Sequence, residues 1–264
     1  MIVQAHKRKV AIVTGSTKGI GRSIAQEMAA TGTTVVVTGR KAEDAQRAAE
    51  AVRDAGGEAL GLKFNIEERD DLASLIALTI DAFGRLDILV NNALSSSSVM
   101  PVDTLSDAQI EQAFTSNITN TYLLTRLAHP HLCATHGQVI NIGSVIVNRH
   151  LSGLPVYSIV KAAMVQMTKV LAAEWAADGV RTNIINPGFI RTSAFSELGM
   201  PEDVVRKSYD FYQAYHPVGT VGEPSDVGRM AAYLASEAGN FMTGSVIEVD
   251  GGYSIQGLPL YQEG

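Results

Sequence analysis

The segment Val10-Ala11-Ile12-Val13-Thr14-Gly15-Ser16-Thr17-Lys18-Gly19-Ile20-Gly21 joins a short apolar run to a stretch of helical spacing. Its three glycines form a Gly-x-x-x-Gly-x-Gly pattern between the predicted strand and the predicted helix. Glycines at such a junction allow a tight turn and a close approach of the backbone to a pyrophosphate, which then lies at the positive end of the helix. The pattern therefore predicts a dinucleotide-binding loop, although glycines at a purely structural turn would look similar.

Beyond this loop, short β-branched runs alternate with longer stretches of helical period, which is typical of parallel strands joined by crossover helices. We predict an α/β protein with a three-layer, doubly wound Rossmann fold: a mostly seven-stranded parallel sheet with helices on both faces, in one domain over residues 1–264. The predicted strands are 9–14, 34–38, 59–64, 87–91, 138–142, 181–185 and 246–249. The predicted helices are 20–31, 42–55, 69–83, 107–135, 156–177 and 225–236.

Composition limits the classes of partner. Of the 264 residues, 46% are apolar and 18% charged, so burial can outweigh chain entropy and the chain is expected to fold. The formal net charge of −6 gives little long-range attraction for nucleic acid or an anionic membrane, and neither is expected as a partner. No stretch is expected to span a bilayer. Cys133 is the single cysteine, which excludes an internal disulfide and favours a cytoplasmic location.

The residues after the second predicted strand bear on the choice of dinucleotide. An NAD site usually carries a carboxylate there for the adenosine ribose, whereas this chain reads Thr38-Gly39-Arg40-Lys41. Arg40 and Lys18 are placed to bind a 2′-phosphate, although both would also be ordinary as solvated surface cations. We therefore expect NADP(H) as the preferred cofactor, with NAD(H) as the alternative.

Tyr157 and Lys161 are four residues apart on a predicted helix and so share a face. A nearby ammonium lowers the pKa of a tyrosine and makes it a usable acid or base near neutral pH. Ser144 follows the predicted strand 138–142 at its carboxyl end, where ligands bind in open α/β sheets. Its hydroxyl could meet the Tyr157 phenol across a substrate oxygen, or it could simply cap a turn.

The segment 192–220 interrupts the alternation and is rich in aromatic side chains. It could form a lid over a substrate pocket, or a helical hairpin whose aromatic residues fill a small core of their own. Its aromatic residues are Phe195, Tyr209, Phe211, Tyr212 and Tyr215.

Taken together, the motifs resemble those of the single-domain short-chain dehydrogenases/reductases, over nearly the whole chain. No single motif is specific, but their shared order and spacing are. The matching motifs are the loop 14–21, Asn91-Asn92-Ala93, Asn117, Ser144, Tyr157-Ser158-Ile159-Val160-Lys161, Asn186-Pro187-Gly188 with Thr192, and the tail 246–252.

The resemblance implies a reaction and a role for each catalytic residue. Nicotinamide exchanges hydride with a carbonyl carbon while Tyr157 exchanges a proton with the oxygen, and Ser144 stabilises that oxygen. Lys161 binds the nicotinamide ribose and lowers the Tyr157 pKa, while Asn117 holds a water of a proton relay. The implied cofactor residues are Gly15, Ser16, Thr17, Lys18, Gly19, Ile20, Gly21, Arg40, Asn65, Ile66, Asn92, Ala93, Tyr157, Lys161, Pro187, Gly188, Ile190 and Thr192. The implied substrate residues are Leu94, Ser144, Val145, His150, Tyr157 and Phe189.

Two positions depart from the family pattern: Leu94 replaces a usual glycine, and Asn65 replaces a frequent aspartate. The chain is expected to be an NADP(H)-dependent oxidoreductase of a small carbonyl or secondary alcohol, and by resemblance a homotetramer. The alternative from another class is a non-catalytic dinucleotide sensor or scaffold. No metal site is expected, because His129 and His131 are two residues apart and do not share a helix face.

Overall fold

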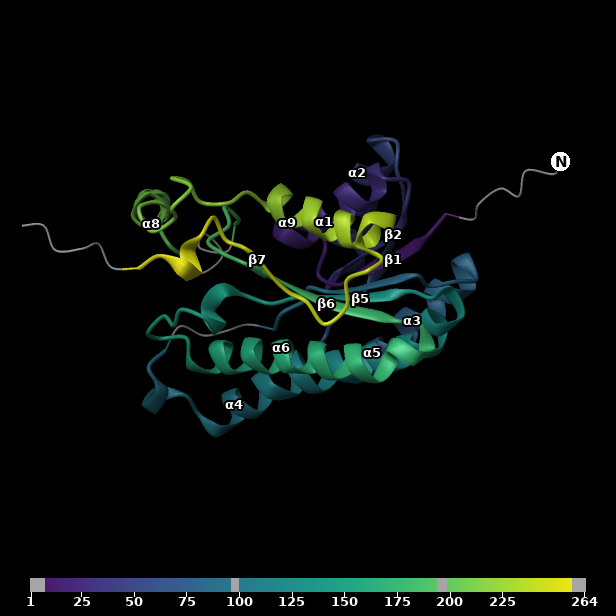
Figure 1. The fold of residues 1–264 in the computed structure, drawn as a ribbon, viewed down its shortest axis with the longest axis horizontal. Coiled ribbons are helices and arrows are strands. Elements are labelled where there is room, and N and C mark those ends of the chain that lie inside the picture. Colours follow the sequence, from purple (N-terminus) through teal and green to yellow (C-terminus); the bar gives the residue numbers. More distant parts are fainter. Residues whose placement is uncertain (1–7, 96–99, 194–198, 258–264) are drawn as a thin grey trace, which may run out of the picture.

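A parallel sheet forms the centre of the protein (Figure 1) in the computed structural model, which describes residues 8–95, 100–193 and 199–257. The strand order is β3-β2-β1-β4-β5-β6-β7, and each neighbouring pair is parallel. This confirms the predicted seven-stranded α/β fold. The strands are β1 (Val10–Val13), β2 (Thr34–Gly39), β3 (Glu58–Lys63), β4 (Ile88–Asn91), β5 (Gln138–Ile142), β6 (Arg181–Pro187) and β7 (Val246–Val249).

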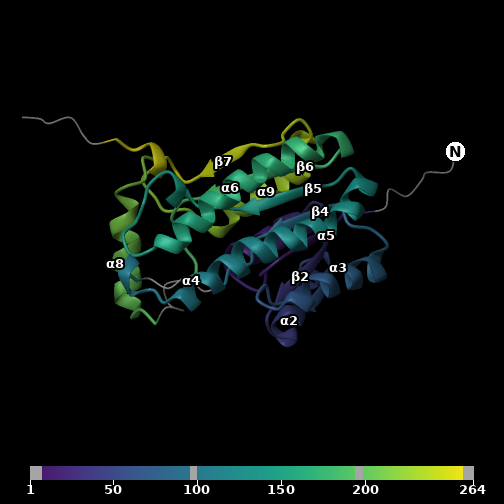
Figure 2. The same ribbon diagram turned by 90° about the horizontal axis from the view of Figure 1, so that it is seen from below.

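Helices cover both faces of the sheet (Figures 1 and 2). One layer contains α1 (Gly19–Ala30), α2 (Ala42–Asp54) and α9 (Pro224–Ala235). The other contains α3 (Arg69–Phe83), α5 (Asn120–Thr135) and α6 (Pro155–Trp175). In β1, Ala11 and Val13 belong to the core on the first side and Val10 and Ile12 to the core on the second. Since successive strand residues face opposite sides, a strand covered on both faces is apolar throughout.

The strand order reverses between β1 and β4. The chain leaves β1 toward β2 and β3 on one side, then crosses to β4 on the other side. The segments that follow β1 and β4 therefore diverge at the carboxyl edge, which opens a crevice where ligands bind in folds of this kind. The glycine loop and the Asn91-Asn92-Ala93 motif meet there.

The predicted helix 107–135 is not uniform. It consists of α4 (Asp107–Phe114), a π-helical turn (Thr115–Thr119) and α5. A capping box between Ser106 and Gln109 fixes the start of α4. A π turn closes i→i+5 hydrogen bonds and inserts a residue, so the residues before and after it present different faces.

Helix α6 is long and apolar. With the 3₁₀ turn that follows it, the helix spans Pro155–Asp178 and, within the described residues, is long and apolar enough to cross a membrane by length and composition alone. Of the 18-residue stretch of this helix that is most apolar, 39% is buried inside the protein. The buried residues include Val160, Met164 and Leu171, and Figure 2 shows α6 lying along the sheet beside α5.

The described part of the segment 192–220 contains one helix, α8 (Glu202–Gln213), at the end of the molecule where the strands finish (Figure 1). Its Tyr209 is buried, while Phe211 is 58% exposed. Tyr212 stacks on Phe189 with ring centroids 3.5 Å apart. The aromatic residues thus partly fill a small core and partly remain at the surface, and Phe195 lies outside the described residues.

Candidate active site

The glycine loop forms a cradle that side chains would fill. Gly15 has φ +62° and Gly19 has φ +56°, a backbone conformation that L side chains rarely adopt. A Cβ at Gly21 would lie 2.4 Å from Asn92 Nδ2 and 2.5 Å from the Gly15 carbonyl oxygen. The loop leads into α1 at Gly19, so its backbone and the helix N-terminus fit a dinucleotide pyrophosphate.

Asn92 holds this loop against the end of β4. Its Nδ2 donates to the carbonyl oxygens of Thr14 (2.9 Å) and Gly15 (3.0 Å). The backbone N–H groups of Asn92 and Ala93 donate to Thr14 Oγ1 at 2.9 and 3.0 Å. Asn92 and Ala93 are both predicted cofactor residues. The side-chain amide of Asn92 positions the glycine loop through its two hydrogen bonds.

Ser16 also stabilises the turn. Its hydroxyl donates to the Val13 carbonyl oxygen at 2.6 Å and accepts from the Thr38 N–H at 2.9 Å. The Gly15 N–H donates to Thr38 Oγ1 at 3.0 Å. Because Ser16 is fully buried, its side chain stabilises the loop, and the backbone of the loop is what can contact a ligand.

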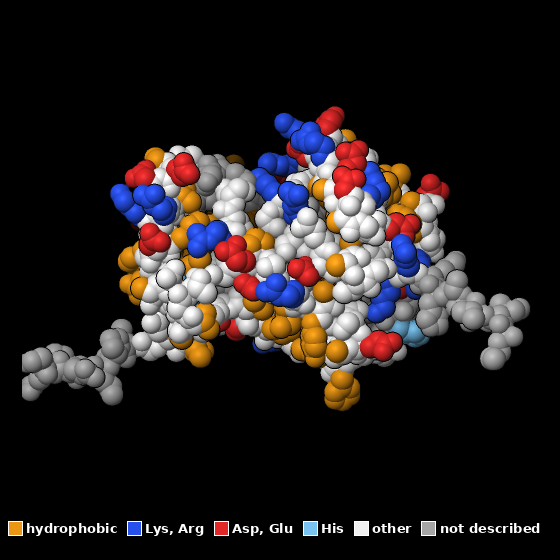
Figure 3. All heavy atoms as spheres, turned by 90° about the horizontal axis from the view of Figure 1, so that it is seen from above, with side chains coloured by type: hydrophobic (Ala, Val, Ile, Leu, Met, Phe, Trp, Pro, Cys, Tyr) orange, Lys and Arg blue, Asp and Glu red, His pale blue; other side chains and the backbone are white. Residues whose placement is uncertain are grey.

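A cavity of about 340 Å³ lies beside the loop, at the position expected for the adenosine end. Figure 3 shows positive and negative side chains together over α1 and α2. Arg40 is exposed directly after β2 and does not line this cavity. The lining residues are Thr17, Lys18, Arg22, Asp44, Arg47 and Ala48, and Arg47 pairs with Asp44.

Asn65 and Ile66 follow β3 at the same edge of the sheet. The Asn65 N–H donates to Asp71 at 2.9 Å, and its side-chain oxygen accepts from the Glu67 N–H at 3.3 Å. Ile66 is buried, and its carbonyl oxygen accepts from Asn120 at 2.8 Å. Asn65 is thus fixed by hydrogen bonds to nearby residues, and Ile66 by one from α5.

The structure brings Ser144, Tyr157 and Lys161 together. Ser144 follows β5, and its N–H donates to Asn186 Oδ1 at 3.1 Å. Its Oγ accepts from the Ile146 N–H at 3.2 Å, so the helix-cap role weighed from the sequence is present too. On α6, Lys161 Nζ donates to the Ile142 carbonyl oxygen at 2.7 Å and lies 5.7 Å from the Tyr157 ring centroid.

The pKa values of these groups differ from the expectation. Burial lowers the pKa of Lys161 from 10.5 to about 8. Burial raises the pKa of Tyr157, and the hydrogen bond with Ser144 opposes this rise. The predicted lowering of the Tyr157 pKa by Lys161 is therefore wrong for the protein's own groups. The ammonium hydrogen-bonds to the β5 backbone and faces the ring, and desolvation of the phenolate dominates.

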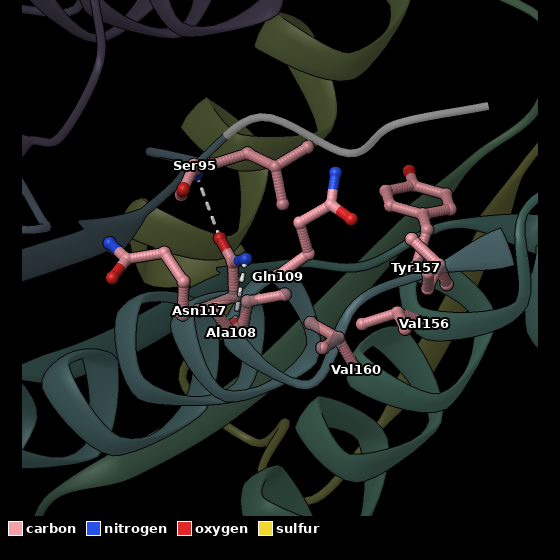
Figure 4. A pocket seen from close by; sticks show the side chains of 11 residues that line it. Ser95, Ala108, Gln109, Asn117, Val156, Tyr157 and Val160 are labelled. Atoms are coloured by element: carbon pink, nitrogen blue, oxygen red, sulfur yellow. Dashed lines mark hydrogen bonds between the residues drawn. The ribbon is translucent and has the colours of Figure 1, made fainter. Parts of the chain in front are cut away.

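Asn117 lies in the π turn and fastens the loop that follows β4. Its Oδ1 accepts from the Ser95 N–H at 2.8 Å, and its Nδ2 donates to the Ala113 carbonyl oxygen at 2.9 Å (Figure 4). Both ends of the amide are thus used within the protein. The π turn also disturbs the regular ladder of backbone carbonyl partners at this point.

Two cavities meet at Tyr157. The first, of about 320 Å³, lies between the loop after β4, α4 and α6 (Figure 4). Leu94, 42% exposed, forms part of its wall, so the departure from the family glycine places an apolar side chain at the pocket. The second, of about 180 Å³, contains Ser144 and lies on the α8 side.

The second cavity collects the remaining predicted residues except Pro187, which is buried at the end of β6, and His150, which is exposed and lines neither cavity. Gly188 is required for close packing, since a Cβ there would lie 2.8 Å from Asp250 Cα. The cavity is lined by Ser144, Val145, Ile146, Arg149, Leu151, Leu154, Tyr157, Gly188, Phe189, Ile190, Thr192, Tyr209 and Tyr253.

Arg149 and Tyr209 line this cavity although neither is among the implied substrate residues, and Tyr209 lies in the segment expected to form a lid or a small core. Arg149 Nη1 donates to the Tyr253 carbonyl oxygen at 3.0 Å, and the guanidinium lies over the rings of Tyr253 (4.5 Å) and Tyr215 (5.4 Å). The Tyr209 hydroxyl accepts from the Thr192 N–H and donates to the Thr192 carbonyl oxygen, both at 3.0 Å. The turn after Ser144 gave no periodicity from which to choose Arg149 over His150.

Comparison with known proteins agrees with this geometry. A family profile described as enoyl-(acyl carrier protein) reductase matches residues 15–254. A tropinone reductase homolog of Arabidopsis thaliana is 34% identical over 95% of this chain and 94% of its own length. A cis-4-hydroxycyclohexanecarboxylate dehydrogenase of Sinomonas cyclohexanicum is 33% identical (95% and 98%). A 3-oxoacyl-[acyl-carrier-protein] reductase of Aquifex aeolicus is 34% identical (92% and 96%).

The fold, the glycine cradle and the Ser144–Tyr157–Lys161 cluster therefore define a nicotinamide-dependent oxidoreductase of alcohol and carbonyl groups. The chain belongs to the short-chain dehydrogenase/reductase family.

Proposed function

We propose that the protein is an NADP(H)-dependent oxidoreductase that interconverts a ketone or other carbonyl and a secondary alcohol, with Tyr157 as the acid and base. The observation that carries this proposal is the position of Tyr157. It lines both cavities, next to Ser144 and one helical turn from the buried Lys161. The adjoining cradle of Gly15, Gly19 and Gly21 fits the dinucleotide.

The bound nicotinamide supplies or accepts the hydride at the substrate carbon. In the reducing direction, Tyr157 gives its proton to the carbonyl oxygen while Ser144 Oγ donates a hydrogen bond to that oxygen. The charge that develops on oxygen is neutralised by this proton. Lys161, with a pKa of about 8, would hold the ribose hydroxyls of the bound dinucleotide, while the β5 backbone anchors its ammonium beside the Tyr157 ring.

The preference for NADP(H) rests on the charge around the adenosine cavity. Lys18, Arg22 and Arg47 line it, and Arg40 follows β2. Asp44 also lines the cavity, but its charge is paired with Arg47. The surplus of cations favours a 2′-phosphate over a bare ribose.

The second cavity favours a substrate that carries a negative group as well as the reacting carbonyl. Arg149 lines it beside Ser144, among the apolar Leu151, Leu154 and Phe189. The guanidinium of Arg149 contacts a backbone carbonyl and two aromatic rings, and no carboxylate among the described residues pairs with it. A guanidinium with unused N–H donors is well suited to a carboxylate. The Sinomonas relative is named for a ring alcohol that bears one.

Exposed apolar side chains support assembly into a homotetramer. Tyr122 and Leu127 on α5, and Ile159 and Val170 on α6, are between 38% and 54% exposed. Near β7, Phe241 is fully exposed. Light scattering on the purified protein tests this assembly, and a monomeric mass would contradict it.

The test of function is consumption of NADPH with 4-oxocyclohexanecarboxylate and with its methyl ester. We expect Tyr157→Phe to reduce turnover by about 100-fold or more while fluorescence titration shows unchanged NADPH binding. Arg149→Met should raise KM for the carboxylate about 10-fold, and leave KM for the ester unchanged. Near-normal turnover by Tyr157→Phe would refute the catalytic assignment, whereas equal KM changes for both substrates would refute the role of Arg149 alone.

A further inference from the structure

A cluster of metal-ligating side chains lies far from Tyr157. His129 and Cys133 are one turn apart on α5, and Asp178 lies in the 3₁₀ turn Ala176–Asp178 after α6. α5 ends just before β5 begins, and this turn ends just before β6 begins. The cluster therefore lies at the edge where strands start, opposite the carboxyl edge that bears the active site.

The three ligand atoms converge on one point. His129 Nε2 lies 3.3 Å from Cys133 Sγ and 3.2 Å from Asp178 Oδ2, and all three atoms are within 4.8 Å of one another. Both short contacts involve the same imidazole nitrogen, which carries at most one hydrogen. A hydrogen of His129 can therefore satisfy one contact but not both, whereas a cation between the atoms would satisfy all three.

Two of the three separations match those between ligands of tetrahedral zinc, and the third, between Cys133 Sγ and Asp178 Oδ2, is at most 4.8 Å. With Zn–S of about 2.3 Å and Zn–N and Zn–O of about 2.0–2.1 Å, tetrahedral angles place N and S about 3.6 Å apart and N and O about 3.3 Å apart. The observed 3.3 and 3.2 Å differ from these values by a few tenths of an ångström at most. Thiolate, imidazole and carboxylate are the donor types that zinc selects.

We propose that His129, Cys133 and Asp178 form a zinc-binding site, with water in the fourth position. The ion would link the end of α5 to the turn before β6. The Asp178 side chain is 48% exposed and that of His129 is 24% exposed, which leaves a path for the ion. Trp175 stacks on the His129 ring with centroids 4.1 Å apart, so the imidazole plane is fixed before a metal binds.

Zinc binds the thiolate form of cysteine, so binding of the ion would release the Cys133 proton. The spacing of His129 and His131 did not suggest this site, because the partner of His129 is the cysteine four residues later.

The test is a titration of the full-length, tag-free protein with Co²⁺ and then Zn²⁺. We expect the visible bands of tetrahedral cobalt, a near-ultraviolet thiolate-to-cobalt band, and loss of both when zinc is added. Cys133→Ser should abolish the thiolate band, and His129→Gln or Asp178→Asn should weaken binding at least about 10-fold. His131→Gln is the matched control and should bind like the wild type.

Thermal unfolding provides a second readout that does not depend on the oxidoreductase reaction. Zinc should raise the Tm of the wild type and of His131→Gln, but not that of Cys133→Ser. Equal cobalt spectra for the wild type and Cys133→Ser, or no binding at micromolar metal, would overturn the proposal. Because the variants alter side chains far from Tyr157, either result leaves the proposed reaction unaffected.

Discussion

The ammonium of Lys161 lies over the ring of Tyr157, 5.7 Å from its centroid, while its hydrogen bond of 2.7 Å goes to the Ile142 carbonyl oxygen. The sheet thus holds the lysine, and the lysine does not hydrogen-bond to the phenol. Burial sets both pKa values, downward for Lys161 and upward for Tyr157.

Replacing Lys161 by methionine should change how stability depends on pH. Below about pH 8 the lysine is charged in both the folded and the unfolded chain; above 10.5 it is neutral in both. Between these values the folded state binds fewer protons, so the wild type gains stability as pH rises, by at most about 3 kcal/mol. Urea unfolding from pH 7 to 10 should show this gain relative to Lys161→Met, and parallel curves would contradict it.

Gly143→Ala should displace Ser144. A Cβ at Gly143 would lie 1.9 Å from Asn186 Oδ1, the atom that accepts from the Ser144 N–H. We expect the free energy of unfolding to fall by about 1–3 kcal/mol. Because Ser144 is displaced, kcat should fall by a larger fraction than the free energy of unfolding does. Gly257→Ala, which would meet nothing within 4 Å, is the control. Wild-type kcat in Gly143→Ala would show that the serine tolerates the shift.

Asn92→Ala should weaken dinucleotide binding without removing any direct contact to it. The change leaves the carbonyl oxygens of Thr14 and Gly15 without their partner and loosens the cradle. A loss of about 1–3 kcal/mol corresponds to about 10-fold to 100-fold weaker binding by fluorescence titration. Asn148→Ala, which removes an exposed hydrogen bond to Glu248, should bind normally.

Arg40→Asp should shift the preference from NADPH toward NADH. A carboxylate directly after β2 repels a 2′-phosphate and accepts from ribose hydroxyls. The ratio of kcat/KM for the two cofactors should fall by at least about 10-fold. Arg53→Asp, at the other end of α2, makes the same change of charge and should leave the ratio unaltered. An unchanged ratio in Arg40→Asp would remove Arg40 from the site and leave Lys18, Arg22 and Arg47.

Local patterns were sufficient for the sheet and for the placement of Ser144, Tyr157 and Lys161. Short apolar runs alternating with helical stretches predicted all seven strands, and the clearest of them, β1 and β2, are buried along their whole length. The four-residue spacing of Tyr157 and Lys161 is a property of any helix, so their shared face followed directly.

Other features depend on tertiary contacts that no local pattern encodes. The direction of the Tyr157 pKa is set by burial and by where the Lys161 ammonium is anchored. The π turn falls in Thr115-Ser116-Asn117-Ile118-Thr119, whose polar residues are weak helix formers but do not specify an inserted residue. Tyr209, on α8, hydrogen-bonds to the backbone of Thr192, 17 residues earlier in the chain. The sequence did not decide whether this segment forms a lid or a helical hairpin.

The π turn separates a helix that lines a cavity, α4, from a helix that packs in the core, α5. Before it, α4 has no buried residue and lines the first cavity through Ala108, Gln109 and Gln112. After it, α5 contributes Leu124 and Leu132 to the core. Variation at the exposed positions of α4 should therefore alter substrate choice at little cost to folding, and a library at Ala108 and Gln112, which keeps the capping residue Gln109, is a practical starting point for redirecting the enzyme to new carbonyl compounds.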